Sequence, residues 1–118
     1  MTQEDKKLLL IDLCSRLPHK VKCEINGRVE ILNSICDDDG YYFNFIGEDK
    51  EGYTLDEVKP YLFPLMSMTM DQAEQWHKYA NDLGGLAPST DWLDEHHFDY
   101  RGLISKGLAN DATNLNVY

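Results

Sequence analysis

The spacing of the apolar residues changes near the start of the chain, and this change limits the folds that the sequence can adopt. Up to Leu17 the apolar residues recur every three or four positions, whereas Val21, Cys23 and Ile25 alternate with polar residues. The first spacing is typical of a helix that packs on one face, and the second is typical of a half-buried strand. The sequence therefore predicts a helix that is followed by a sheet.

The predicted N-terminal helix covers residues 1–17. Thr2 is the expected N-cap, the acidic residues of the first turn suit the positive end of the helix dipole, and Pro18 ends the helix. Because Cys14 and Cys23 occupy apolar positions of their elements, we expect both thiols to be buried and unreactive. The apolar stripe of the helix contains Leu9, Leu10, Leu13, Cys14 and Leu17.

The dipeptide Asn26-Gly27 predicts a β-hairpin. A two-residue turn would place the apolar residues of the second strand on the face opposite to those of the first strand. A three-residue loop over 26–28 instead pairs Ile25 with Val29 and brings the apolar side chains of both strands to one face. Because burial of one face normally sets strand register, we predict the three-residue loop.

The predicted sheet covers residues 20–66 and consists of three to five short strands joined by tight polar turns. The run Asp37-Asp38-Asp39-Gly40 is interpreted as a hairpin turn, because it lacks the ligand order and the downstream glutamate of an EF-hand calcium loop. Short strands of this kind suggest a small antiparallel sheet that is curled like an SH3-type barrel.

The predicted helical part covers residues 69–109, and residues 110–118 are expected to be a tail. Thr69 and Gln72 form a capping box at the start of its first helix, which Gly84-Gly85 would end. A second helix is expected from Pro88-Ser89-Thr90 onward, and Asp99 is expected to cap a further short helix.

A chain of 118 residues is long enough for one core, so we expect a single α+β domain over 1–118. We expect apolar residues of the segment 91–109 to pack against the sheet and close its core. The residues expected to close the core are Trp92, Leu93, Phe98, Leu103 and Ile104.

The charge balance argues against several partners. The chain carries 21 acidic and 11 basic residues, a net charge of −10. Direct binding to nucleic acid is disfavoured because phosphates would be repelled, and an anionic membrane surface is disfavoured for the same reason. A protein that mimics nucleic acid with its own carboxylates, and so inhibits a DNA-binding enzyme, remains an alternative.

Three cysteines at wide spacing form no CxxC pair and indicate no disulfide framework. The start of the chain lacks the pattern of a secretory signal, and no apolar run approaches the length of a membrane span. We therefore expect a cytoplasmic protein with no membrane association.

The densest group of polar and aromatic residues lies in the same segment 91–109. We expect His97, Asp99, Tyr100 and Arg101 to form a hydrogen-bonded cluster at a bend, and these four are the candidate interaction residues. A small metal-dependent hydrolase that uses His97 and Asp99 is an alternative interpretation. We predict no catalytic residue, no metal and no cofactor, because none of the recognised catalytic motifs occurs in the sequence.

Two stretches of the sequence, "VKPYLFPLMSMT" and "DWLDEHHFDYRGLISKGLA", together with the opening "MTQEDKKLLLIDLCSRLP", resemble a family of short uncharacterised proteins from Bacteroides and related gut bacteria. These proteins are often encoded in phage-like or mobile regions. Met66 departs from the family pattern, which usually has serine there. The matching residues are Lys59, Pro60, Tyr61, Leu62, Pro64, Leu65, Met68 and Thr69 in the first motif, and Asp91, Trp92, Leu93, His97, Phe98, Asp99, Tyr100, Arg101, Gly102, Leu103, Ile104, Lys106, Gly107, Leu108 and Ala109 in the second.

The resemblance implies a small regulatory or host-interaction protein but no particular activity. Together with the acidic composition and the absence of catalytic motifs, it leads us to expect a non-catalytic protein that acts by binding a protein partner. Self-association as a homodimer is a further possibility.

Overall fold

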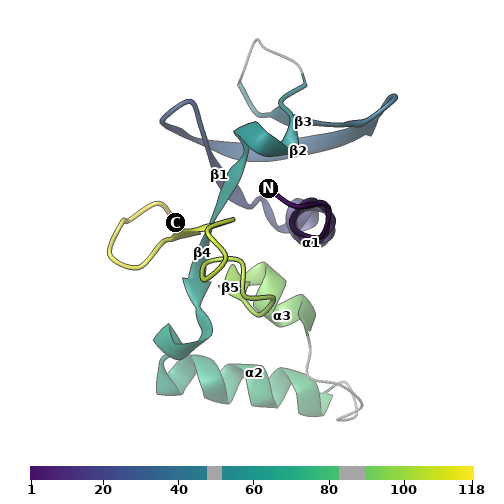
Figure 1. The fold of residues 1–118 in the computed structure, drawn as a ribbon. Coiled ribbons are helices and arrows are strands. Elements are labelled where there is room, and N and C mark those ends of the chain that lie inside the picture. The colour runs from purple at the N-terminus through teal and green to yellow at the C-terminus, as the bar shows by residue number, and fades with distance from the viewer. Residues whose placement is uncertain (48–51, 83–89) are drawn as a thin grey trace.

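The computed structural model describes residues 1–47, 52–82 and 90–118 (Figure 1). Along the chain an N-terminal helix precedes four strands, and two further helices precede two short strands that join the same mixed sheet. The fold is therefore α+β, as predicted. The helices are α1 (Gln3–Arg16), α2 (Met70–Asp82) and α3 (Thr90–Glu95). The strands are β1 (Lys22–Ile25), β2 (Arg28–Asp37), β3 (Tyr41–Phe45), β4 (Lys59–Pro64), β5 (Phe98–Asp99) and β6 (Asn110–Asp111).

The predicted helix starts are confirmed at α1 and α2. The Thr2 hydroxyl accepts a hydrogen bond from the Asp5 amide, and the Asp5 carboxylate accepts one from the Thr2 amide. Thr69 and Gln72 form the same reciprocal box at α2. Such boxes satisfy amides that the first turn of a helix leaves without partners. The predicted C-cap Gly84-Gly85 and the start at Pro88-Ser89 lie outside the described residues.

The strands follow the order β3-β2-β1-β4-β5, with β6 also on β4. Pairing is antiparallel from β3 to β4, as predicted for the sheet over residues 20–66. The strands β5 and β6, which lie outside that region, pair with β4 in parallel and make the sheet mixed. The parallel β4–β5 pair arises because the chain crosses over through α2 and α3 before it returns. The strands that the structure describes form an open sheet, and an SH3-like barrel is not confirmed.

The predicted register of the first hairpin is wrong. Ile25 pairs with Arg28, so that Asn26 and Gly27 alone form the turn, both with positive φ. This backbone is the type I′ geometry that suits Asn-Gly, and the turn therefore sets the register at the expense of Val29, which is exposed. The β2–β3 pairing shifts in register between Leu32 and Ser34, and beyond this shift Ile35 pairs with the buried Phe43 and packs against the core.

The Asp37–Gly40 segment is the turn between β2 and β3, as predicted. The segment after Asp99, by contrast, forms turns instead of the predicted short helix, and residues 110–118 are not a detached tail. β6 pairs with β4, and Ala112 is buried. Both differences reflect contacts with distant strands, which local patterns of sequence do not record.

Two apolar clusters are built on this framework. The larger joins Leu9 and Leu13 of α1 to the inner faces of β1 to β4 and to the turn residue Leu103. The smaller contains Trp92, Leu93 and Phe98, with side chains of β4 and α2 packed against them. The predicted core role of these residues is confirmed. In Figure 1, β4 runs from the β2–β3 hairpin to α2, so that it spans the distance between the two clusters.

Candidate functional site

A buried ionic network connects α1 to α3 and to the loop that follows β5. At its centre is Asp12, which is fully buried. One carboxylate oxygen accepts a hydrogen bond from Arg16 Nε at 2.9 Å, and the other accepts one from Arg101 Nη1 at 2.7 Å. Asp12 therefore bridges two guanidinium groups, one from its own helix and one from a segment that lies 89 positions further along the chain.

Arg16 occupies the interior of this network and has no exposed surface. Its Nη2 donates to the Phe98 carbonyl at 2.6 Å, and its Nε lies 4.0 Å from the Asp94 carboxylate. Its Nη1 is buried with no hydrogen-bond partner among the described residues. Because a buried charge is stable only when it is paired and hydrogen-bonded, the position of Arg16 depends on both aspartates.

Tyr100 closes the network on the side of α3. Its hydroxyl donates to the Asp94 carboxylate at 2.8 Å, and the Arg101 guanidinium carbon lies 4.4 Å from the centre of its ring. Burial, followed by the hydrogen bond to Asp94, raises the pKa of Tyr100. The phenol is thus held as a neutral donor, which suits a structural role.

Asp99 and His97 are not part of this network, so the predicted cluster of His97, Asp99, Tyr100 and Arg101 does not form. The two Asp99 oxygens accept the amides of Leu103 and Ile104, both at 2.9 Å. Asp99 thus holds the turn that follows β5. Tyr100 and Arg101, the two residues that follow Asp99, instead donate hydrogen bonds to Asp94 and Asp12.

His97 stacks against Tyr118, with ring centres 3.8 Å apart and ring planes 12° apart. The Tyr118 hydroxyl accepts the Lys22 amide at 2.8 Å and donates to the Tyr61 carbonyl at 2.9 Å. Burial, followed by the positive charge of Arg16, lowers the pKa of His97 to about 4. A neutral ring that stacks on another ring is packed as part of the fold.

The positions of His97 and Asp99 do not favour a metal centre. Both oxygens of Asp99 are already bonded to backbone amides. Across the part of the chain that the structure describes, no group of three or more His, Cys, Asp or Glu side chains is placed to hold a metal ion. Two donors that face different neighbours do not make the four-ligand or three-ligand set that zinc uses.

The thiols differ from the prediction at one position. Cys23 is buried, and burial followed by the charge of Asp12 raises the pKa of its thiol. Cys14 is exposed on α1, although partial burial raises the pKa of its thiol as well. The prediction that Cys14 is buried is therefore wrong, because the buried stripe of α1 runs through Asp12 and Arg16 instead.

Sequence reasoning missed Asp12 and Arg16. Their spacing of four residues places them on one side of α1, and Asp12 directly precedes the buried Leu13. Polar residues four apart beside an apolar stripe are normally a solvated pair at its edge. A pairing partner for Arg101 in α1 was the missing signal, and only the folded chain supplies it.

An apolar surface lies at the turn between β4 and α2. We call Leu65, Met66 and Met70 the methionine surface; their exposed fractions are 42%, 93% and 81%. Leu65 and Met66 belong to a short 3-10 turn that follows β4, and Met70 is the first residue of α2. Most exposed apolar residues of a monomer are scattered singly, whereas these three lie within six positions of the chain.

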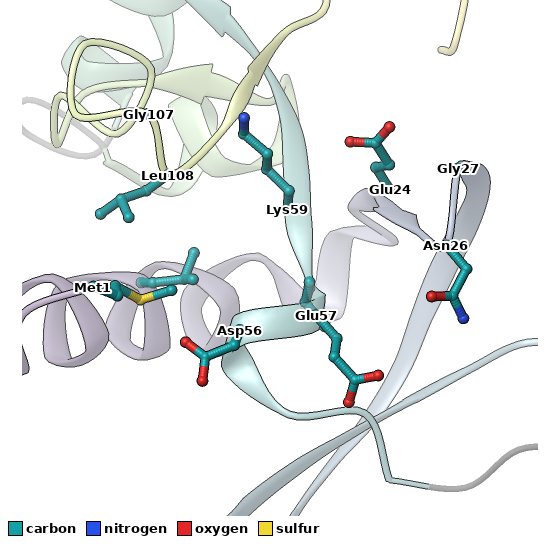
Figure 2. A pocket seen from close by; sticks show the side chains of 11 residues that line it. Met1, Glu24, Asn26, Gly27, Asp56, Glu57, Lys59, Gly107 and Leu108 are labelled. Carbon is teal, nitrogen blue, oxygen red and sulfur yellow. The ribbon is translucent and has the colours of Figure 1, made fainter.

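A hollow of about 240 Å³ opens beside the same turn, and its lining includes Phe63, Ser67, Thr69, His96 and Phe98. A second hollow of about 290 Å³ lies near α1 and the start of β4 (Figure 2). Figure 2 shows that the Asp56 and Glu57 carboxylates in this second hollow point away from the Lys59 ammonium. Polar groups that do not converge are not arranged to orient a small ligand.

Comparisons with known proteins give no family for this chain. A scan against protein-family models, a search of curated proteins and a search of solved structures each found no match. In the described part of the chain, no helix has the length and apolar character needed to cross a membrane.

Proposed function

We propose that this chain is a small, acidic, non-catalytic protein that acts by binding a protein partner through the methionine surface. The observation that carries the proposal is the exposure of Met66 and Met70, at 93% and 81%, beside the exposed Leu65. Methionine is flexible and polarisable, and it is common on surfaces that adapt to partners. A partner that covers these side chains would remove their apolar area from water.

Three polar residues of the segment 91–109 support a non-catalytic role because they are engaged within the fold. Asp94 and Arg101 are hydrogen-bonded to Ser15 and Asp12 of α1. Asp99 accepts hydrogen bonds from the amides of Leu103 and Ile104. A catalytic acid or base needs access to a substrate within hydrogen-bond reach. The metal-dependent hydrolase that would use His97 and Asp99 is therefore less well supported than a binding protein.

A nucleic-acid mimic needs its carboxylates at the surface. Asp12, Asp94 and Asp99 are buried and satisfy groups of the protein itself, which lowers the number of carboxylates available for mimicry. The remaining acids are interpreted as a charged surface that keeps the protein soluble. We therefore keep mimicry as an alternative that the same experiments address.

The cytoplasm is the proposed location. The three cysteines, Cys14, Cys23 and Cys36, are free thiols, a state that a reducing compartment preserves. The resemblance to short proteins of mobile genetic regions suggests that the partner belongs to the host cell or to the mobile element. Regulation by binding, without chemistry, is consistent with both settings.

The test is a pull-down from host lysate with three forms of the tagged full chain, followed by quantitative mass spectrometry. The forms are the wild type, the variant Met66→Ser/Met70→Ser, and the control Ile11→Ser/Leu115→Ser, which changes two exposed apolar residues elsewhere. We expect a protein that the wild type and the control retain and that the methionine variant loses at least about tenfold, a change of about 1.4 kcal/mol in binding.

Equal retention by all three forms would contradict the proposal. Light scattering of the purified chain, run alongside, tests whether the partner is a second copy. A dimer that the methionine variant abolishes would identify the surface as a homodimer interface, whereas a monomer in both forms leaves a different protein as the partner. Mimicry would be favoured instead if the chain retained a DNA-binding enzyme, if added salt released that enzyme, and if the methionine variant still bound it.

A further inference from the structure

The methionine surface belongs to an acidic part of the chain. Between Pro60 and Tyr100 the sequence contains seven acidic residues but a single basic one, Lys78. Asp94 and Asp99 of this stretch are buried, so their charges are used inside the fold. Among the residues of α2 and α3 whose side chains the structure describes, the exposed acids are Asp71, Glu74, Asp91 and Glu95.

Two of these acids lie next to the methionine surface. Asp71 directly follows Met70 in the first turn of α2, and Glu74 lies one turn further on. Positions 70 and 74 are four residues apart and so share a side of the helix. An apolar contact made at Met70 thus brings a partner within reach of at least one carboxylate, which attracts basic groups and repels acidic ones.

The hollow beside the 3-10 turn sets the size of the group that can enter. Its volume of about 240 Å³ is below the range of about 300–1,000 Å³ that is usual for small-molecule sites. Phe63 and Phe98 provide apolar walls, and the Thr69 and Gln72 side chains are already occupied by the capping box. This combination suits one apolar side chain of a partner better than a whole metabolite.

We infer that the partner presents a basic amphipathic segment, whose apolar face covers Leu65, Met66 and Met70 and inserts one side chain into the hollow. The inference rests on the proposed function and adds the chemistry of the partner. An amphipathic helix that docks by its apolar face is a recurring mode of recognition, and basic residues on its other positions would meet Asp71 and Glu74. A second copy of this chain is disfavoured as the occupant, because two bodies of net charge −10 repel each other.

The test uses the full chain and three synthetic peptides of equal length, titrated by fluorescence anisotropy at low and at physiological salt. The first peptide has leucines at helical spacing and lysines elsewhere, the second has glutamates in place of the lysines, and the third has the composition of the first in shuffled order. We expect the first peptide to bind at least about tenfold more tightly than either of the others, and to bind less tightly as salt is added.

Variants of the chain assign the binding to the surface. Met66→Ser/Met70→Ser should weaken the first peptide at least about tenfold, because the apolar contact is lost. Asp71→Asn/Glu74→Gln should weaken it several-fold and flatten the salt dependence. The matched control Asp38→Asn/Asp39→Asn changes the net charge by the same amount at the β2–β3 turn, which lies at the opposite end of the molecule from α2 (Figure 1), and should leave affinity near that of the wild type.

The outcomes separate the inference from the proposed function. Equal binding of the basic and acidic peptides, or equal effects of the two charge variants, would overturn the inference that the partner is basic. If the methionine variant still weakened binding in that case, the proposed role of the methionine surface would be retained. Binding of the basic peptide that the methionine variant leaves unchanged would overturn the inference by placing the contact elsewhere. Failure of all three peptides would also overturn it, and the lysate comparison would then decide on the proposed function alone.

Discussion

Replacement of Asp12 by asparagine should destabilise the fold far more than its small change in size suggests. The carboxylate is fully buried and accepts hydrogen bonds from Arg16 at 2.9 Å and from Arg101 at 2.7 Å. Asparagine keeps the shape but removes the charge. The guanidinium of Arg16 would then remain buried with Asp94, at 4.0 Å, as its nearest carboxylate.

The expected cost is about 3 to 5 kcal/mol, the range that follows when one partner of a buried ion pair is removed. A domain of this size has about 5–15 kcal/mol of stability, so the loss is a large part of the total. With an unfolding entropy of about 2.1 cal/mol/K per residue, the midpoint of thermal unfolding should fall by about 12–20 °C for a chain of 118 residues.

Urea denaturation followed by tryptophan fluorescence measures this free energy, with Asp39→Asn as the matched control. Asp39 is exposed in the β2–β3 turn, and its left-handed backbone conformation is one that asparagine also adopts readily. The control should change stability by less than about 0.5 kcal/mol. A loss below about 1 kcal/mol for Asp12→Asn, or equal losses for both variants, would refute the view that the network holds α1 to the C-terminal segment.

Three further predictions address other features of the fold. Tyr118→Phe removes a hydroxyl bonded to two backbone groups and should cost about 1–2 kcal/mol, whereas Tyr41→Phe at an exposed position should cost nothing measurable; equal effects would contradict the assigned contact. Gly27→Ala should cost about 1 kcal/mol in urea denaturation because φ is +77°, and an unchanged midpoint would contradict the two-residue turn. The pKa of His97 is about 4 in the folded chain against 6.5 ordinarily, so the unfolded chain binds the proton first and stability should fall from pH 6.5 toward pH 4. His97→Phe keeps the stacked ring and removes the pH-dependent stability that His97 contributes. That contribution is at most about 3 kcal/mol, with allowance for the partial exposure of the ring. Parallel curves of stability against pH for the two proteins would count against the assigned pKa.

Local rules predicted the helix starts correctly and the first hairpin incorrectly. The capping boxes at Thr2 and Thr69 depend on residues three positions apart, so the sequence contains all the information that is needed. At Asn26-Gly27 two rules compete, since turn chemistry favours two residues and burial favours three. The turn prevails because Val29 can be left exposed on a sheet that retains enough other apolar contacts.

The contacts that the sequence did not reveal join distant parts of the chain. β5 and β6 have two residues each, which is too short for any period, and both exist only because β4 offers them an edge. The partner of Arg101 was expected among nearby acids, but Asp12 is 89 positions away. The types of residue in the segment 91–109 thus predicted a polar cluster, while the fold determined which residues belong to it.

The methionine surface is a feature that the sequence alone left ambiguous. An apolar turn before an amphipathic helix is usually part of a core, and Met68 does pack against the smaller cluster. Met66 and Met70, on either side of it, are exposed. Only the direction in which the 3-10 turn leaves β4 separates these neighbours, so the candidate surface follows from the structure.

The most direct test of the account is the map of amide chemical-shift changes that the basic amphipathic peptide produces in the labelled full chain. We expect the largest changes in residues 65–74, which include the methionine surface, and around His96, which lines the hollow. We also expect small changes at Asp12, Arg16 and Arg101, because these residues hold the fold together. Changes centred on His97 to Arg101, with none near Met66, would contradict the account.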